Sequence, residues 1–229
     1  MKTRGERYFI RLPRFGARLY DRFLSVEPIQ SRIAEIAHDL VSRTKSGKLL
    51  DVGTGPGRLL SEINRLNPDL ELFGLDISAS MIRVARNNLQ NIRADLRVGS
   101  IRHTDFESTF FTAVTSVGSF YLWDYPEESL EEIFRILKKG ASAYLFEVYK
   151  DINETDYRNA LRENLRQLNW VRRLVGPFAL RKSLKMSYRT EDFVRIIEKT
   201  SFAGSYTIEK MELSGIPMWA RITLKKMPS

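Results

Sequence analysis

Three alternating glycines, Gly53, Gly55 and Gly57, stand between an apolar run and a helical pattern. Residues 48–52 before them are typical of a buried strand, and apolar side chains recur at helical spacing from Leu59 onwards. A strand that turns on glycine into a helix presents free backbone N–H groups and the positive end of the helix dipole. Glycine also lets a ligand approach the backbone closely. The stretch therefore predicts a site for a nucleotide-type ligand.

The spacing of these glycines bears on the identity of the ligand. A dinucleotide fingerprint, G-x-G-x-x-G, would need a third glycine at the position of Arg58. Asp51 precedes the turn, where an acid would repel a pyrophosphate but suits a cationic group. Asp76 ends the next predicted strand, where it can accept hydrogen bonds from two ribose hydroxyls. NAD and S-adenosylmethionine (SAM) both have such a ribose, so Asp76 alone leaves both open.

The composition restricts other site chemistries. The 229 residues include no cysteine, which excludes disulfides, thiolate metal sites and a cysteine nucleophile. There are two histidines, His38 and His103, so a histidine metal site is not expected.

The elements that must position these residues alternate along the chain. Buried strands are predicted at residues 48–52, 71–76, 94–98, 113–117 and 142–148. Helices are predicted at residues 57–66, 79–90 and 126–138, with Ser78 capping the second of them. Regular alternation of this kind favours an α/β fold, in which helices cover both faces of a parallel sheet.

Other segments flank this alternating core. Two helices, predicted at 7–24 and 28–43, precede the first strand. Residues 151–189 break the alternation and are interpreted as a basic helical insertion over the strand ends. A helix from 190 to about 200 then leads to two strands, 205–213 and 218–226, that a turn joins as a hairpin at the sheet edge.

We expect one domain over residues 1–229. Its parts would be an N-terminal helical cover (1–47), a binding core (48–150), the insertion (151–189), and the last helix with the terminal hairpin (190–229).

The net charge of +9 is spread unevenly. Residues 1–22 carry +5 and residues 158–189 carry +8, whereas residues 23–157 carry −5. Two basic segments thus flank an acidic core and indicate an anionic partner such as RNA or a membrane surface, although basic residues also serve solubility. No apolar run approaches the ~18–20 residues of a membrane span. The charged N-terminus lacks a signal-peptide pattern, so a cytoplasmic protein is expected.

Several motifs, in order, resemble those of class I SAM-dependent methyltransferases. They are Leu49–Gly57, Phe73–Ser78 with Met81, and Glu132–Gly140. The resemblance is closest to the small-molecule branch that includes the ubiquinone/menaquinone-biosynthesis C-methyltransferases, and it covers residues 48–148. It implies a Rossmann-like sheet of seven strands, mostly parallel with an antiparallel last strand. It also implies SAM as the cofactor and S-adenosylhomocysteine (SAH) as the product.

The resemblance carries over to single positions of a cofactor site. Asp76 matches the acid that holds the ribose hydroxyls. Ser100 stands where the family often has an acid that contacts the adenine amine, so this contact is expected to be weaker or to pass through water. The positions implied to bind the cofactor are Asp51, Gly53, Thr54, Gly55, Gly57, Asp76, Ile77, Met81, Ser100, Ile101, Ser116, Val117 and Gly118.

Methyl transfer is an in-line displacement, so the protein must mainly align the reacting groups and exclude water. A base is required only if the acceptor must lose a proton. Glu147 and His103, near the ends of predicted strands, are the candidate bases, although a histidine in a surface loop is the simpler interpretation of His103. Tyr20 lies in the segment similar to the family's N-terminal cover and is a candidate to face the acceptor.

Aromatic residues follow the fourth predicted strand. They would form a wall for a flat or apolar acceptor, unless they pack in the core. They are Phe120, Tyr121 and Trp123.

Three functions remain open. The first is an enzyme that methylates a small-molecule acceptor, apolar, aromatic or anionic, in a cleft closed by lids from 7–44 and 151–189. The second is an RNA- or protein-directed methyltransferase that docks through the basic segments. The third is a SAM-binding module without catalysis. Both a monomer and a homodimer are compatible with the sequence.

Overall fold

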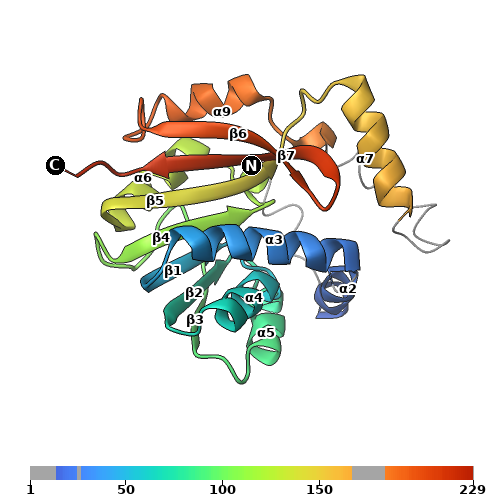
Figure 1. Cartoon of the computed structure of the whole chain (residues 1–229). Coiled ribbons are helices and arrows are strands. Elements are labelled where there is room, and N and C mark those ends of the chain that lie inside the picture. The colour runs from blue at the N-terminus through green and yellow to red at the C-terminus, as the bar shows by residue number, and fades with distance from the viewer. Residues whose placement is uncertain (1–13, 25–26, 167–183, 229) are drawn as a thin grey trace.

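The computed structural model describes residues 14–24, 27–166 and 184–228 (Figure 1). Residues 7–13 of the first predicted helix and residues 167–183 of the predicted insertion lie outside the described residues.

One sheet of seven strands organises the chain. Its order is β3-β2-β1-β4-β5-β7-β6. The strands are β1 (Gly47–Val52), β2 (Leu70–Asp76), β3 (Ala94–Val98), β4 (Phe111–Val117), β5 (Leu137–Val148), β6 (Tyr206–Leu213) and β7 (Ile216–Lys225). All pairs among β1 to β5 are parallel, and β7 runs antiparallel to both of its neighbours. The predicted sheet, with its antiparallel last strand, is confirmed.

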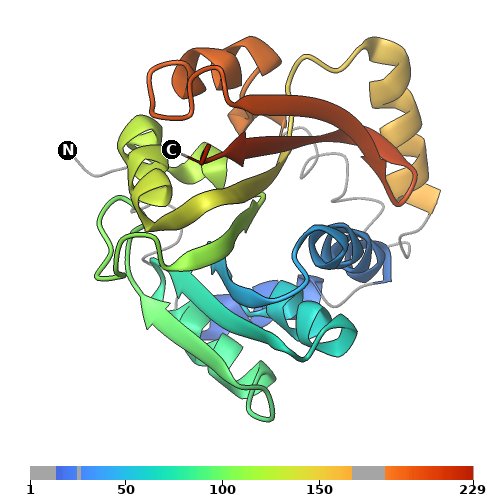
Figure 2. The same ribbon diagram turned by 60° about the vertical axis from the view of Figure 1, so that its left-hand side comes forward.

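Helices cover both faces of this twisted sheet (Figure 2). They are α2 (Arg14–Leu24), α3 (Glu27–Arg43), α4 (Arg58–Leu66), α5 (Ala79–Asn88), α6 (Pro126–Ile136), α7 (Glu154–Arg166) and α9 (Thr190–Ile197). A short 3-10 helix, η1 (Phe120–Leu122), follows β4. Ser78 caps α5 as predicted, since its Oγ accepts a hydrogen bond from the amide of Met81.

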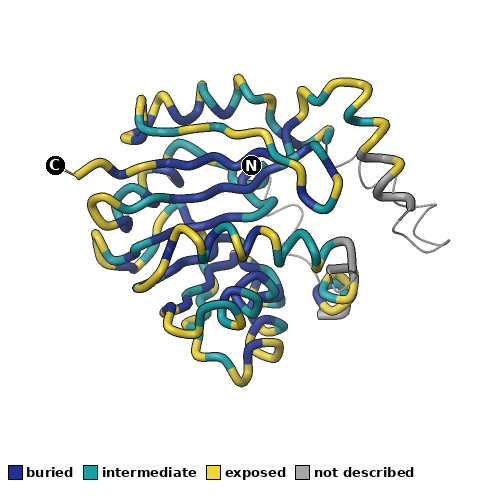
Figure 3. The backbone as a smooth tube through the Cα atoms, viewed as in Figure 1, coloured by how far each residue is buried: buried dark blue, intermediate teal, exposed yellow. Residues whose placement is uncertain are grey.

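Strand β1 is buried on both of its faces, which explains its unbroken apolar run. Leu49 packs in the core between the sheet and α3 and α4. Leu50, one residue later, points to the opposite face and packs in the core that α6 and α9 cover. Figure 3 shows the central strands in the colour of buried residues. The carboxyl end of β1 is therefore held rigidly from both sides.

The terminal hairpin closes through a tight turn of two residues. Leu213 pairs with Ile216, and the turn residues Ser214 and Gly215 have φ angles of 50° and 74°. Two consecutive residues with positive φ match the right-handed twist of the strands that they join. The turn is shorter than the four residues expected from the sequence.

The boundary between α6 and β5 differs from the prediction. A helix was expected to residue 138, but it ends at Ile136, and β5 begins at Leu137 instead of residue 142. Tertiary partners take the carbonyl groups at this helix end, since the Lys226 ammonium donates hydrogen bonds to the carbonyls of Phe134 (2.7 Å) and Leu137 (2.8 Å). These partners lie about ninety residues away in the sequence, so local pattern could not place the boundary.

The described residues of the insertion include helix α7, which packs against β7. Within the described residues, every helix is too short or too polar to span a lipid bilayer.

Candidate functional site

The glycine turn uses its own backbone N–H groups inside the protein. The amides of Gly53 and Thr54 both donate to the Leu75 carbonyl at the end of β2, at 2.8 and 3.1 Å. The Gly55 amide donates to the carboxylate of Asp76 at 2.8 Å. The three turn glycines have φ angles between 53° and 77°, which only glycine adopts readily. The turn has the expected shape, but these amides are not free to bind an anion.

Asp76 joins the two loops that follow β1 and β2. One of its carboxylate oxygens accepts from Gly55 and the other from the Ser78 amide, each at 2.8 Å. Burial raises the pKa of Asp76, while the two amide bonds act in the opposite direction. Each carboxylate oxygen retains acceptor capacity beyond these bonds, because an ionised carboxylate has about four lone-pair sites.

The ends of β1 and β4 are joined at Ser119. Its hydroxyl lies 3.1 Å from the Val52 carbonyl and 2.6 Å from the hydroxyl of Ser116. A Cβ atom added at Gly53 would come within 2.5 Å of this hydroxyl. Gly53 is therefore required by close packing as well as by its φ of 75°.

Glu147, at the end of β5, fixes the loop that follows β4. Its side chain is buried, and its Oε1 accepts hydrogen bonds from the amides of Ser119 and Phe120, both at 2.9 Å. Burial raises the pKa of Glu147 to about 8, against the effect of these two bonds. The pKa of Tyr121 is raised by burial first, and by the nearby Tyr20 and Glu147.

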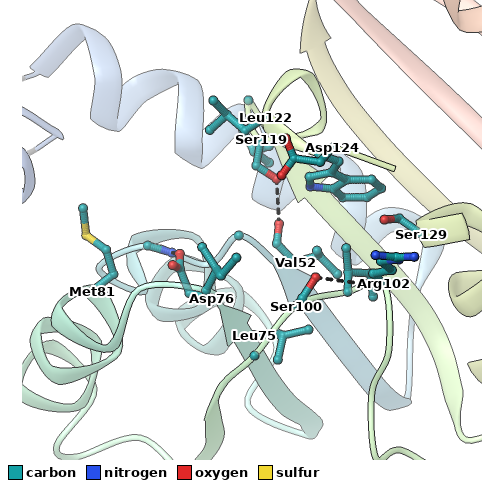
Figure 4. A pocket seen from close by; sticks show the side chains of 18 of the residues that line it. Val52, Leu75, Asp76, Met81, Ser100, Arg102, Ser119, Leu122, Asp124 and Ser129 are labelled. Atoms are coloured by element: carbon teal, nitrogen blue, oxygen red, sulfur yellow. Dashed lines mark hydrogen bonds between the residues drawn. The ribbon is translucent and has the colours of Figure 1, made fainter. Parts of the chain in front are cut away.

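One cavity of about 330 Å³ opens at the carboxyl ends of β1 to β4, within the range of small-ligand sites. Figure 4 shows Asp76 and Met81 at one side and Asp124, Arg102 and Ser129 at the other. The cavity is lined by Tyr20, Val52, Gly53, Gly55, Leu75, Asp76, Ile77, Met81, Gly99, Ser100, Ile101, Arg102, His103, Val117, Gly118, Ser119, Leu122, Trp123, Asp124, Tyr125 and Ser129.

The structure brings most of the predicted site residues to this cavity. Those that line it are Tyr20, Gly53, Gly55, Asp76, Ile77, Met81, Ser100, Ile101, His103, Val117, Gly118 and Trp123. Those that do not line it are Asp51, Thr54, Gly57, Ser116, Phe120, Tyr121 and Glu147. Asp51, Thr54 and Ser116 are buried behind the lining, and their assignment to the cofactor stays a prediction.

The aromatic residues after β4 are divided between the core and the cavity. Phe120 is fully buried and packs against Trp123, Tyr188 and Phe193, so it belongs to the core. Trp123 also lines the cavity, together with Leu122. The aromatic wall therefore exists in part.

Sequence reasoning missed the far side of the cavity. Arg102 lies with its guanidinium 4.0 Å from the centre of the Tyr125 ring and hydrogen-bonds Glu128 at 2.5 Å. Asp124 and Ser129 also line this side. Each is close in sequence to a predicted residue, but only the packing of α6 beside the loop after β3 shows that they meet.

The site suits a cationic ligand with a ribose. Asp51 is 3% exposed, and burial raises its pKa to about 7, with the charge of Asp76 adding to the rise. A positive group nearby would restore the ionised form of such an acid. At Gly118, which also lines the cavity, a Cβ would meet no atom within 4 Å, so the backbone is open to a ligand. The residues present therefore fit SAM better than a pyrophosphate-bearing dinucleotide. Among the described residues, no group of three or more His, Cys, Asp or Glu side chains could hold a metal ion.

Comparison with known proteins agrees with this site. Residues 50–145 match the family model described as a methyltransferase domain. An uncharacterised methyltransferase of Bacillus subtilis is 29% identical over 100 residues, which are 44% of this chain and 55% of that protein. The demethylmenaquinone methyltransferase of Thermotoga maritima is 27% identical over 140 residues, 57% of this chain and 60% of that protein. The matches thus span little more than half of these two relatives.

Solved structures share the whole fold. A candidate SAM-dependent methyltransferase of Methanococcus maripaludis superposes with a TM-score of 0.70 at 22% identity, covering 96% of this chain and 95% of that one. The plantazolicin methyltransferase BpumL, crystallised with SAH, gives a TM-score of 0.68 at 16% identity over 93% of this chain and 90% of that one. At these identities the likeness concerns the fold. Together with the methyltransferase domain matched over residues 50–145, it supports assignment of this part of the chain to the class I SAM-dependent methyltransferases.

Proposed function

We propose that the protein transfers the methyl group of SAM to a small-molecule acceptor. The observation that carries this proposal is one cavity in which the glycine turn and Asp76 face an apolar wall made by Leu122 and Trp123. Cofactor groups and acceptor groups must share one space for an in-line displacement.

The cofactor end of the cavity is formed by loops after β1, β2 and β3. Asp76 would accept hydrogen bonds from the ribose hydroxyls, and Gly55, where an added Cβ would have its nearest neighbour at 4.0 Å, leaves room for the ligand beside the turn. Ile77 and Met81 would pack against the adenine, while Ser100 takes the place of the acid expected there. When bound, SAM supplies an electrophilic methyl group on a positively charged sulfur.

The other end of the cavity favours a flat or apolar acceptor. Leu122 and Trp123 form an apolar surface that can stack on such a molecule and exclude water. Arg102 and His103, which line the same cavity, would suit an anionic substituent. The acceptor class is therefore an apolar or aromatic small molecule, with an anionic group as a further feature.

His103 is the better placed of the two candidate bases. It lines the cavity, whereas Glu147 is buried behind it with Oε1 engaged by the amides of Ser119 and Phe120. Imidazole is the commonest general base in enzymes. We assign Glu147 instead to holding the loop after β4, and His103 to proton removal where the acceptor requires it.

Tyr20 supports a closing role for the N-terminal helix. It comes from α2, outside the sheet, yet it lines the same cavity as Asp76. Residues 167–183 of the other proposed lid, 151–189, lie outside the described residues. The domain organisation with an N-terminal cover over a SAM-binding core is part of the same proposal.

The function is tested in two steps. Calorimetry measures binding of SAM and SAH to the wild type, to Asp76→Ala, and to a control, Asp69→Ala, which removes an exposed acid. Binding that is lost in the first variant and kept in the second supports the cofactor site, and binding that survives Asp76→Ala contradicts it.

The acceptor is then sought with methyl-labelled SAM against extracted metabolites, lipids and RNA fractions. Label in a small apolar or aromatic product supports the proposal. Label only in RNA would favour the RNA-directed alternative, and SAM binding with no transfer would favour the non-catalytic one.

A further inference from the structure

Helix α2 buries little of its described apolar surface. Among its described side chains, residues 16–22, Ala17 is fully buried, but Leu19 is 58% exposed. Asp21, by contrast, is partly buried and reaches toward α4 and α5. The polar contacts of Asp21 therefore contribute to holding this stretch in place.

Asp21 forms a two-point ion pair with Arg58. The Arg58 Nε donates to Oδ1 at 2.8 Å, and Nη2 donates to Oδ2 at 3.0 Å. The two side chains are only 16% and 31% exposed, so water screens the pair less than it screens a surface pair. A bidentate guanidinium–carboxylate pair also fixes direction as well as distance, which a lysine cannot do.

The partners of Asp21 belong to the framework of the cofactor site. Arg58 directly follows Gly57 and is the first residue of α4. Asn88, the last residue of α5, donates one hydrogen bond to Asp21 at 3.1 Å and another to the carbonyl of Pro56 in the glycine turn at 2.9 Å. Docking of α2 is thus coupled to the turn itself. Helix α2 also packs against α5.

The neighbour of Asp21 in the chain is Tyr20, which lines the cavity. Tyr20 and Asp76, the acid assigned to the ribose, line the same cavity. Burial, and then the negative charge of Asp76, raise the pKa of Tyr20. A ligand held by Asp76 and the glycine turn therefore shares the cavity with Tyr20. When Asp21 is held by Arg58, the backbone of α2 keeps Tyr20 at that place.

We propose that Asp21 and Arg58 form a latch that keeps α2 and Tyr20 over the cofactor cavity and slows cofactor release. Both are positioning residues, since they act through Tyr20. The inference rests on the proposed function in taking SAM and SAH as the ligands. It also gives a role to Arg58, which stands where a dinucleotide fingerprint would have glycine.

The test is the rate of SAH dissociation from the intact protein, measured by stopped-flow displacement. Asp21→Asn keeps the shape of the side chain but removes its charge, and we expect SAH to leave about tenfold faster, with the unfolding temperature of the ligand-free protein little changed. Arg58→Lys keeps the charge but cannot form the two-point pair, so a smaller increase is expected. High salt should speed release from the wild type and have less effect on Asp21→Asn.

A matched control lies on the same helix. Glu62→Gln removes another arginine pair of α4, that of Glu62 with Arg65 at 2.8 Å, and should leave SAH release unchanged. The exchanged pair, Asp21→Arg with Arg58→Asp, should release SAH more slowly than either single reversal. If the pair served folding alone, the exchanged variant would not slow SAH release while its unfolding temperature stayed the same as that of the single reversals.

Equal release rates in the wild type, Asp21→Asn and Arg58→Lys would overturn the latch while leaving the cofactor assignment intact. Failure of the wild type to bind SAM or SAH would instead overturn the proposed function. If Asp21→Asn does not fold, Arg58→Lys and the exchanged pair decide the question.

Discussion

The carboxylate of Asp76 accepts a 2.8 Å hydrogen bond from the amide of Gly55. An acid at the end of β2 thereby fixes the loop at the end of β1, and one residue both shapes the site and faces its cavity. Because the Gly55 amide is engaged in this bond, it cannot donate a hydrogen bond to a phosphate. This relationship separates the site from a dinucleotide site more directly than the glycine spacing does.

Two replacements of Asp76 should weaken cofactor binding to different extents. Asp76→Asn keeps an acceptor oxygen but loses the charge that strengthens its bonds, and we expect SAM affinity to fall about tenfold. Asp76→Ala should cost about 2–3 kcal/mol or more of binding free energy, because both amide bonds and the ribose contact disappear. Calorimetric titration with SAM measures both, and equal affinity of Asp76→Ala and the wild type would contradict the assignment.

Gly53→Ala should destabilise the protein by about 2–4 kcal/mol. The added Cβ would lie 2.6 Å from the Cβ of Ser119, and the φ of 75° disfavours a side chain in any case. Chemical denaturation measures the loss. The double variant Gly53→Ala with Ser119→Gly removes the clash but not the backbone strain. Its loss of stability should therefore be smaller than the sum of the losses in the two single variants. Simple additivity would show that close packing is not the cause.

Stability should fall as the pH rises from about 4.5 to 8. Burial raises the pKa of Glu147 from 4.5 to about 8, so in this interval the folded protein keeps a proton that the unfolded chain has lost. The free energy of unfolding then decreases with pH, by up to about 1.4 kcal/mol per pH unit for this group. Asp51, with a pKa raised from 3.8 to about 7, acts in the same direction at lower pH.

Glu147→Gln isolates the first contribution. The neutral amide keeps an oxygen for the Ser119 and Phe120 amides but cannot titrate, so the variant should lose stability less steeply between pH 5 and 8. Urea denaturation at a series of pH values gives the two slopes. Parallel slopes for the variant and the wild type would show that Glu147 ionises near its ordinary pKa.

Lys226→Met should cost about 2–4 kcal/mol of folding stability. The Lys226 ammonium is buried and donates to carbonyls at the end of α6, which would be left without this donor. Lys225→Met, at the exposed neighbouring position, is the matched control and should change stability little. Thermal unfolding measures the stability of both variants. Similar losses of stability would contradict a special role for Lys226.

Much of the fold could be predicted because its signals are local. The apolar run before Gly53 identified β1, and the alternation of strands and helices identified the parallel sheet. The terminal hairpin and the cap at Ser78 were also predicted, since turns and helix caps depend on neighbouring residues. The α6 boundary was misplaced because Lys226, far along the chain, takes part in ending that helix.

The features of the site also divide into those that the sequence predicted and those that only the structure shows. Residue type and spacing predicted the glycine turn and Asp76 as an acid that can hold a ribose, and the order of the motifs gave the resemblance to the SAM-dependent methyltransferases. Only the tertiary structure decided that Phe120 packs in the core, that Glu147 holds a loop, and that the far wall includes Arg102. The physical reason is that a cavity wall is made where loops from separate strands meet, and those contacts leave no periodic trace in the sequence.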